Sequence, residues 1–505
     1  MLFNSAEFLL LFLPITFLVY FGLNHRRLTL AGKTWLILAS LFFYGWWNPA
    51  YVVLILVSML ANFAIGSGLT RGQGSAAATG SPRPGVPSRK GLLFVGMAFN
   101  LGLLGYFKYA DFFVANVNSL AGADWALPQV VLPLAISFFT FTQIAYLVDA
   151  YRSEAKEYDL LNYVLFVTFF PHLIAGPILH HKEMMPQFAS RWSRIRQYPN
   201  ILLGLFIFSM GLFKKTVIAD GFATWATAGF DKAEVLNFFE AWGASLSYTF
   251  QLYFDFSGYS DMAIGAALLF NIRLPINFNS PYKALNIQDF WRRWHMTLSR
   301  FLRDYVYIPL GGNRRGRLHT HANLFATFLL GGLWHGASWM FVIWGALHGI
   351  AIVLHRIWRD WGGRMPTALA WLLTFNFINV TWVFFRARDM DAALKVLGGM
   401  VGLNGILLPQ ALADRSSWLR EAGQTWGLQF GQWVSRLDGN YQIFAWLAGA
   451  LVLSLFFRNS NQLVLDADRR ELMNGRWLAW CALLMLVSLT AILASSYTEF
   501  IYFNF

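Results

Sequence analysis

The sequence predicts an all-α protein that crosses a membrane several times, and composition, hydropathy and the grouping of apolar residues predict this fold. Of the 505 residues, 57% are hydrophobic and 13% are charged, whereas roughly 25% of a soluble domain is charged. The mean hydropathy is +0.46. Many apolar blocks approach the ~20 residues that a helix needs to cross a bilayer. These blocks are Phe8–Phe21, Ala50–Leu69, Gly91–Tyr106, Val130–Tyr146, Ile201–Phe213, Leu369–Phe385, Tyr441–Phe457 and Trp477–Leu493.

Other features of the composition exclude several classes of protein. The first apolar block follows Glu7 rather than a basic segment and lacks a small-residue cleavage site, so we expect a retained helix and not a signal peptide. The single cysteine, Cys481, lies inside the last block, which excludes a disulfide framework and a cysteine-rich metal motif. A net charge of +13 is explained by basic cytoplasmic loops. We therefore expect a lipid bilayer and no nucleic acid as partner.

The basic residues predict which loops face the cytoplasm. Residues 25–33 hold two arginines, a lysine and a histidine. The stretch Arg71–Lys90 is rich in Gly, Pro, Ser and Ala, contains no acidic residue, and is predicted to be a flexible cytoplasmic loop. Two spans joined at Trp46–Pro49 separate these loops, so we expect the N-terminus to be periplasmic. Residues 111–129 contain two aspartates and no Lys or Arg, which suits the outer face.

Two apolar segments do not fit a simple crossing. Tyr163–Leu179 contains two prolines, which interrupt a helix, and is predicted to be a broken or re-entrant helix buried in protein. Asn323–Leu354 would be about 48 Å long as one helix, too long for a straight crossing of a ~30 Å core. We expect a break at Gly331–Gly332. No internal repeat and no soluble domain is evident beyond a less apolar region, residues 402–439, so residues 1–505 are predicted to form one transmembrane domain.

The segment Gln288–Gly316 combines basic and aromatic residues with helical spacing. One face of a helical wheel carries Arg292, His295, Ser299 and Arg303, and the other carries Phe290, Trp294, Leu298, Phe301 and Tyr305. Such a helix can lie in the cytoplasmic interface with its arginines on lipid phosphates. Alternatively, its basic face lines a funnel for an anionic substrate, to which the Gly- and Arg-rich loop 311–317 adds phosphate donors. The residues alone leave both interpretations open.

His335 is the strongest candidate for chemistry. It lies among tryptophans in GGLWHGASWMFVIWGALHG, and ionisable residues inside a membrane are functional candidates by default. The structural alternative is a neutral histidine that hydrogen-bonds another helix. A buried neutral imidazole can act as a general base for a hydroxyl that attacks an activated carbonyl, which is acyl transfer. The glycine pairs Gly332/Gly336 and Gly345/Gly349 have the spacing that allows close helix packing.

The other histidines do not indicate a site. His348 and His355 share one helical face and are expected to be structural or interfacial. No role is assigned to His172, His180 or His181, which flank the prolines. Neither an HExxH zinc motif nor a GxSxG nucleophile motif is present, so we expect no metal and no serine acyl-enzyme.

Short motifs follow one another from Met1 to Phe505. They are MLFNSAEFLLLFLPI, FFYGWWNP, FPHLIAGPI, FDFSGYSDMAIG, NFNSPY, DFWRRWHMTLSRFLRDYVYIPLGG, GGLWHG, WVFFRA and FIYFNF. Together they resemble the membrane-bound O-acyltransferase family. The resemblance is greatest to the bacterial branch containing the alginate O-acetylation membrane protein, the peptidoglycan O-acetyltransferase membrane subunit and the D-alanyl transporter of teichoic acid.

The resemblance implies a bundle of about eleven transmembrane helices with re-entrant and interfacial helices. It also implies cytoplasmic and periplasmic funnels that meet near a catalytic region, residues 288–349. It makes His295 and His335 the characteristic histidines, with His335 catalytic. The resemblance and the funnel interpretation together predict the residues that line or support the acyl-donor funnel. These are Asp289, Arg292, Ser299, Arg303, Asn313 and Trp334.

The resemblance further implies that acetyl-CoA is a substrate from the cytoplasm and that no cofactor is permanently bound. A periplasmic acetyltransferase of the SGNH-hydrolase type would complete transfer to the acceptor, with the chain in the bacterial inner membrane. The leading hypothesis is O-acetylation of an exported polysaccharide such as alginate, with peptidoglycan acetylation or D-alanyl transfer to teichoic acid as alternatives. A transporter or flippase without acyl chemistry is the alternative from another class, although the missing repeat disfavours common transporter folds.

Overall fold

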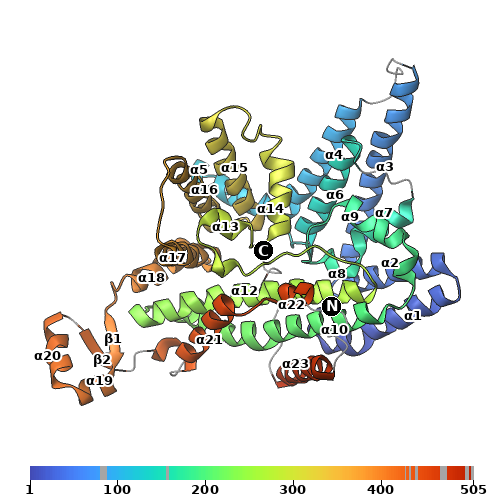
Figure 1. Cartoon of the computed structure of the whole chain (residues 1–505). Coiled ribbons are helices and arrows are strands. Elements are labelled where there is room, and N and C mark those ends of the chain that lie inside the picture. Colours follow the sequence, from blue (N-terminus) through green and yellow to red (C-terminus); the bar gives the residue numbers. More distant parts are fainter. Residues whose placement is uncertain are drawn as a thin grey trace.

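A computed structural model describes residues 1–79, 88–154, 159–426, 428–431, 434–437, 442–466, 475–494 and 500–501. These residues are predominantly helical, and Figure 1 shows helices packed around a long central helix. The only sheet in the described part of the chain is a parallel pair, β1 (Ile406–Pro409) and β2 (Leu428–Gly431). The predicted all-α fold class is confirmed.

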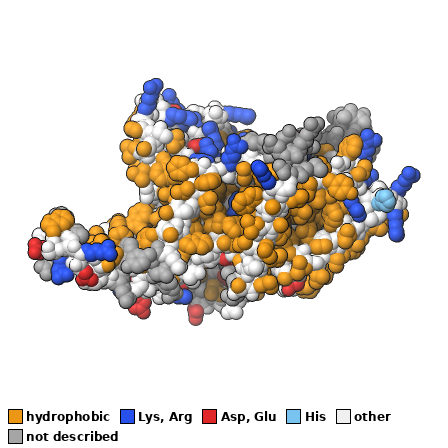
Figure 2. Space-filling view, turned by 60° about the horizontal axis from the view of Figure 1, so that its bottom comes forward, with side chains coloured by type: hydrophobic (Ala, Val, Ile, Leu, Met, Phe, Trp, Pro, Cys, Tyr) orange, Lys and Arg blue, Asp and Glu red, His pale blue; other side chains and the backbone are white. Residues whose placement is uncertain are grey.

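The surface of the molecule is that of a membrane protein. Figure 2 shows hydrophobic side chains over most of the visible middle, with Lys and Arg gathered toward the upper edge. An apolar belt bounded by charged residues is typical of a protein that crosses a bilayer. The polytopic membrane fold is confirmed, while the number of about eleven crossings stays a prediction. By length and composition, 7 helices of the described residues could span: Phe8–His25, Ala50–Thr70, Arg89–Ala121, Tyr198–Lys232, Trp339–Asp360, Thr367–Arg386 and Gly475–Ala494.

The first four helices form one side of the bundle, which Figure 1 draws in blue on the right, and the fifth lies away from them. Residues 80–87 of the predicted flexible loop lie outside the described residues; the helix before them ends at Thr79 and the next begins at Arg89. Ser88 caps that second helix by accepting a hydrogen bond from the Gly91 amide at 3.1 Å. The helices are α1 (Leu13–His25), α2 (Thr29–Gly45), α3 (Ala50–Thr79), α4 (Arg89–Leu104) and α5 (Ala110–Ala121), with π-helical turns at Phe8–Phe12 and Gly105–Tyr109.

The central helix is α12 (Phe238–Leu269), which is buried along nearly its whole length and packs against α10 (Tyr198–Phe213). Glycines allow the two backbones to approach closely. A Cβ atom at Gly204 would lie 2.8 Å from the carbonyl oxygen of Gly265, and one at Gly211 would lie 2.5 Å from that of Gly258. A larger residue at either position would therefore force the two helices apart.

Buried ion pairs allow acidic residues in α12. Lys215 lies 2.8 Å from Asp255 and Lys214 lies 2.6 Å from Asp261, and all four side chains are largely buried. A buried carboxylate is tolerated when a cation neutralises it and hydrogen-bonds it. The two lysines belong to a π-helical turn, Lys214–Ala219, which is followed by α11 (Asp220–Thr227) and a second π-helical turn, Ala228–Lys232.

The segment Tyr163–Leu179 is broken, as its prolines predict. After α6 (Ile136–Tyr151), the chain forms α7 (Leu160–Thr168) and the short α8 (Phe170–Leu173), and then continues without regular structure to α9 (His181–Ala189). These residues are buried in the protein. Non-helical backbone at this depth requires such burial, because lipid cannot satisfy free amide and carbonyl groups.

The prediction of one helical wheel across Arg292, His295, Ser299 and Arg303 is wrong. The chain forms two short helices, α13 (Ile287–Trp291) and α14 (Met296–Leu302), followed by a π-helical turn, Arg303–Tyr307. The two helices are separated by residues 292–295, and His295, directly before α14, has a φ of +42°, which is outside the right-handed helical region.

The predicted break at Gly331–Gly332 is also wrong. α15 (Arg317–His335) continues through both glycines and ends at His335, and α16 (Trp339–Asp360) follows a turn of three residues. Gly332 instead permits close packing of the two helices, because a Cβ atom there would lie 2.4 Å from the Phe341 carbonyl oxygen. The chain is interrupted at residues 336–338, a position that depends on packing between the two helices and that the sequence does not reveal.

The C-terminal third packs along the bundle and adds a small projection, which Figure 1 shows on the left. This projection contains both strands and covers most of the less apolar region predicted from sequence, 402–439. The elements are α17 (Thr367–Arg386), α18 (Met390–Met400), β1, α19 (Gln410–Arg415), α20 (Ser417–Trp426), β2, α21 (Gln442–Phe456), α22 (Ser460–Asp466) and α23 (Gly475–Ala494). Short 3-10 turns among the described residues are Arg191–Arg194, Pro281–Lys283 and Ser435–Leu437.

Candidate active site

His335 lies at the C-terminal end of α15, inside an aromatic enclosure. Its ring centroid is 5.0 Å from that of Trp334, 5.1 Å from Trp344 and 5.2 Å from Phe385. Only 3% of the residue is exposed. Rings on several sides restrict the imidazole to a narrow range of orientations and exclude bulk water from it, which suits a group that must accept a proton.

Side chains from the π-helical turn Gly105–Tyr109 hold the backbone at the end of α15. The Lys108 ammonium donates to the carbonyl oxygens of Trp334 at 2.6 Å and His335 at 3.1 Å, and the Tyr109 hydroxyl donates to that of Leu333 at 2.7 Å. The last carbonyls of a helix have no intrahelical partner, and a cation there complements the helix dipole. Lys108 and Tyr109 therefore fix the turn that carries His335.

His295 occupies the break between α13 and α14 and is completely buried. Its Nδ1 lies 3.1 Å from the side-chain oxygen of Asn277, which also accepts hydrogen bonds from the amide and hydroxyl of Thr297. Because Asn277 Oδ1 can only accept, His295 Nδ1 carries the proton and donates. In the neutral imidazole the other nitrogen, Nε2, then has the lone pair.

The structure brings the two predicted histidines into one aromatic region. Trp294, next to His295, lies 5.0 Å from Trp382, and Trp382 lies 5.2 Å from Phe385, which contacts His335. His295 is close enough to contribute to the electrostatic environment of His335. We call this region, with His295, His335 and the rings around them, the histidine chamber.

His348 is structural, as expected. Its Nδ1 accepts a hydrogen bond from Trp291 Nε1 at 3.1 Å, so its Nε2 carries the proton and donates to the Thr381 hydroxyl at 3.1 Å. Both ring nitrogens are therefore engaged in links between α13, α16 and α17. This arrangement stabilises Trp291 and leaves no nitrogen for a substrate.

A basic pocket of about 560 Å³ opens between α13, α14, α15 and α16. None of its described lining residues is acidic. Arg300 is paired with Glu183 at 2.5 Å and Arg303 with Asp304 at 2.7 Å, whereas Arg292 and Arg356 have no side-chain partner among the described residues. The basic side chains that line it are Arg292, Arg300, Arg303, His355, Arg356 and Arg359. Concentrated guanidinium groups in a concave site favour a phosphate-bearing ligand.

Three of the predicted funnel residues line the basic pocket, namely Arg292, Ser299 and Arg303. Asp289 does not; its carboxylate forms an ion pair with Arg293 at 2.9 Å. Asn313 is exposed in a turn and does not line the pocket. Trp334 is buried and stacks on Phe141 with ring centroids 4.8 Å apart.

An aromatic layer lies between the basic pocket and the histidine chamber, and neither His295 nor His335 lines the pocket. Trp291 forms part of the pocket wall, and its ring centroid is 5.8 Å from that of Trp344, which contacts His335. The side chains of Trp291 and Trp344 therefore separate the basic pocket from His335.

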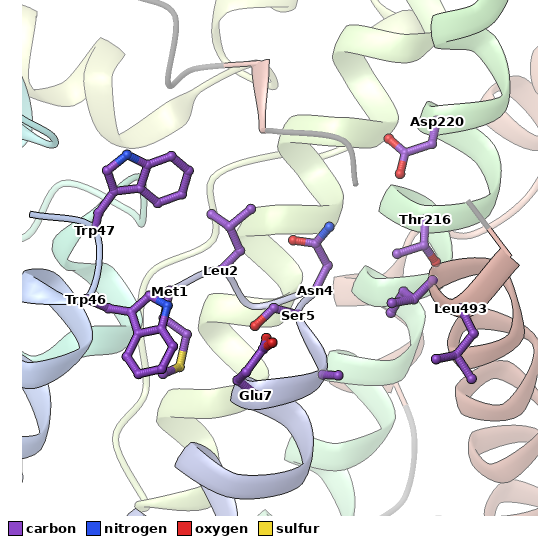
Figure 3. Close-up of a pocket in the computed structure, with 12 residues that line it drawn as sticks. Met1, Leu2, Asn4, Ser5, Glu7, Trp46, Trp47, Thr216, Asp220 and Leu493 are labelled. Atoms are coloured by element: carbon purple, nitrogen blue, oxygen red, sulfur yellow. The ribbon is translucent and has the colours of Figure 1, made fainter. Parts of the chain in front are cut away.

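A second pocket of about 620 Å³ surrounds the N-terminal segment. Figure 3 shows Trp46 and Trp47 on one side of it, Asp220 on the other, and the N-terminal residues between them. Ring contacts lead inward from this N-terminal pocket. They pass in order through Phe3, Tyr259, Phe500, Phe256 and His295, with centroid separations of 4.3–5.9 Å.

The remaining histidines pack the broken segment. His172 Nε2 lies 2.9 Å from the Phe166 carbonyl oxygen, and His180 Nδ1 lies 3.3 Å from Asp149 and 2.9 Å from the Tyr305 hydroxyl. His181 packs against Phe166 at 5.2 Å. In the part of the chain that the structure describes, no three His, Cys, Asp or Glu side chains are grouped to hold a metal ion.

Several known acyltransferases are similar to this chain. The chain is 47% identical to the peptidoglycan O-acetyltransferase of Helicobacter pylori over 100% of its own length and 98% of that protein. It is 36% identical to the probable alginate O-acetylase AlgI of Pseudomonas putida over the full length of both. It is 27% identical to the teichoic acid D-alanyltransferase of Bacillus subtilis over 50% of this chain and 69% of that protein. Residues 122–388, which include the basic pocket and both histidines, match the MBOAT family. The chain therefore belongs to the membrane-bound O-acyltransferase family and is an O-acyltransferase.

Proposed function

We propose that the chain takes acetyl groups from acetyl-CoA in the cytoplasm and passes them across the inner membrane for O-acetylation of a cell-envelope polysaccharide. The basic pocket is the observation that carries this proposal. Coenzyme A presents several phosphates, and paired guanidinium hydrogen bonds are the strongest side-chain ligands for phosphate. Arg292 and Arg356, which lack a carboxylate partner among the described residues, are the donors we assign to those phosphates. Acetyl-CoA acts as substrate, and no cofactor is required to stay bound.

The thioester has to pass the aromatic layer to reach His335. Trp291 is positioned by its hydrogen bond to His348, and Trp344 packs against His335 and His348. We infer that the thioester end of bound acetyl-CoA displaces the Trp291 or Trp344 ring. This movement would connect the basic pocket to the histidine chamber. Phosphate binding in the basic pocket would supply the energy for this displacement.

His335 is the proposed general base. It removes a proton from the hydroxyl that first receives the acetyl group, while the oxygen of this hydroxyl forms a bond to the acetyl carbonyl carbon. The tetrahedral intermediate then breaks its carbon–sulfur bond, and the thiolate of coenzyme A takes the proton from the imidazolium. His295 Nε2 is assigned to orienting a reacting hydroxyl, because Asn277 holds the opposite nitrogen in its donor form.

Peptidoglycan is the acceptor that the comparisons favour. Identity to the Helicobacter pylori peptidoglycan enzyme is 47% over the whole chain, against 36% for the Pseudomonas putida alginate protein. Alginate or another exported polysaccharide remains the second candidate, whereas the teichoic acid enzymes match only half of the chain. We assign the final transfer to a periplasmic partner of the SGNH-hydrolase type, which would approach from the side of the N-terminal pocket if the N-terminus is periplasmic.

The decisive test measures acetyl-CoA hydrolysis and acetyl transfer by the purified chain in proteoliposomes. Removal of the base in His335→Ala lowers the rate at least ~10²-fold, while His25→Ala, at the exposed end of α1, retains parental activity. Equal folded amounts are verified by size-exclusion chromatography. An active His335→Ala protein would refute the base assignment, and a parent that turns over no acetyl-CoA would favour D-alanyl transfer or transport without chemistry.

A further inference from the structure

An apolar groove of about 650 Å³ runs between α16 and α17 on the outside of the bundle. One stripe of α16 and one stripe of α17 line it, among them Ile350, Leu354, Leu373 and Phe377. The Arg359 guanidinium and the His355 imidazole line the same groove, and no described lining residue is acidic. An ordinary contact with lipid tails would not need charged groups at this position.

We propose that this groove binds one anionic phospholipid, with its phosphate at Arg359 and His355 and an acyl chain along the groove. Basic sites between transmembrane helices on the cytoplasmic side are the known chemical environment for such headgroups. Arg359 has no ion-pair partner among the described residues. Its guanidinium is oriented by a hydrogen bond that it donates to the side-chain oxygen of Gln288 at 3.2 Å. The apolar walls match a lipid tail, which a soluble phosphate lacks.

The dimensions of the groove agree with one leaflet of a bilayer. From Leu347 to Arg359, both in the lining, α16 rises about 18 Å, against about 15 Å for half of a hydrocarbon core. Trp358 and Trp361 lie at the cationic end and are 45% and 81% exposed. Tryptophans gather at membrane interfaces, so they place the cationic end at headgroup level.

The lipid site shares a wall with the basic pocket, because His355 and Arg359 line both. A lipid phosphate on Arg359 would therefore compete with the phosphates of the acyl donor. Anionic lipid is then expected to raise the acetyl-CoA concentration needed for half-maximal rate. The lipid site itself does not rest on the proposed function, but this coupling does.

Lipid binding is tested by native mass spectrometry of the full chain with phosphatidylglycerol or phosphatidylcholine. The parent should retain several-fold more phosphatidylglycerol. Thr374→Trp, which fills the groove from α17, should lose this retention, and Arg359→Gln should lose the preference for the anionic lipid. Leu372→Trp is the matched control, because Leu372 lies on α17 outside the groove and is 48% exposed.

Equal retention of both lipids by the parent, or equal behaviour of Thr374→Trp and Leu372→Trp, would overturn the site. Dihexanoyl phosphatidylglycerol, which keeps the headgroup but has short tails, should bind far more weakly; if it binds equally, the ligand is a soluble phosphate. Displacement of acetyl-CoA by the Thr374→Trp ring would assign the groove to the donor instead.

Coupling is tested in proteoliposomes with and without phosphatidylglycerol. The anionic lipid should raise the KM for acetyl-CoA in the parent and in Leu372→Trp but not in Thr374→Trp. Because all three share the same bulk surface charge, a uniform rise would exclude a specific role for the groove. A parent that retains phosphatidylglycerol but turns over no acetyl-CoA would refute the proposed function and leave the lipid site intact.

Discussion

The basic pocket and the histidine chamber use opposite physical means within one short stretch of chain. The pocket concentrates arginines where water can reach them, so it can attract an anion from a distance. The chamber surrounds two buried imidazoles with rings, so it can hold a neutral base. Trp291 and Trp344 lie between the two regions. The difference indicates that binding and chemistry are separate tasks, and substitutions should divide into effects on KM and effects on kcat.

The largest effect outside the histidines is expected at Lys108. Lys108→Met removes the donor to the Trp334 and His335 carbonyls, so the turn that carries His335 shifts. A displacement of about 1 Å can cost about 10²-fold in rate, and we expect this loss in kcat with little change in the KM for acetyl-CoA. Lys108→Arg, which keeps a cationic donor, should recover most of the rate. A rise in KM without a fall in kcat would show that Lys108 acts on binding.

Substitutions in the basic pocket should raise the KM for acetyl-CoA and leave kcat unchanged. Arg356→Gln removes a guanidinium that has no carboxylate partner among the described residues. A charge-assisted hydrogen bond contributes about 1.5–3 kcal/mol, so the KM for acetyl-CoA should rise roughly 10-fold or more while kcat is preserved. Arg314→Gln, on an exposed turn outside the pocket, is the charge-matched control. Equal effects of the two variants would mean that only net charge matters.

A substitution at His348 distinguishes a structural histidine from a catalytic one. His348→Leu leaves the buried Trp291 indole N–H without its acceptor, which should lower the free energy of unfolding by about 1–3 kcal/mol. Thermal unfolding in detergent measures this loss. The kcat per folded molecule should fall far less than in His335→Ala, and a comparable fall would place His348 in the chemistry.

Sequence predicted those features that local chemistry determines. Prolines in residues 163–179 predicted a broken helix, and apolar surroundings predicted that His335 is buried. Gly332 was misassigned because a glycine that breaks a helix and one that packs against a neighbour look alike until the neighbour is known. The α12 helix escaped detection because buried acids such as Asp255 lower its hydropathy, and only the structure supplies their lysine partners.

Long-range contacts explain most of what sequence reasoning missed. Lys108 contacts the Trp334 carbonyl across 226 residues of sequence, and no local pattern predicts this partner. Arg292 and His295 were expected to share one face of a helix. His295 instead has a left-handed backbone conformation, and its side chain contacts Asn277. The sequence does offer one signal for Lys108, a lysine among apolar residues, because charged residues inside a membrane usually have a function.

The smallest effect is expected at Asn313, a predicted funnel residue in the segment Gln288–Gly316. It is exposed in a turn and does not line the basic pocket, so Asn313→Ala should change the KM for acetyl-CoA by no more than about twofold, the usual range for a surface substitution. Arg292→Gln, in the same segment but in the pocket wall, should raise that KM by roughly the same factor as Arg356→Gln. Measuring both variants in one donor titration tests whether position in the pocket, rather than membership of this segment, determines donor binding. A large effect at Asn313 would mean that the turn folds over the pocket when the donor binds.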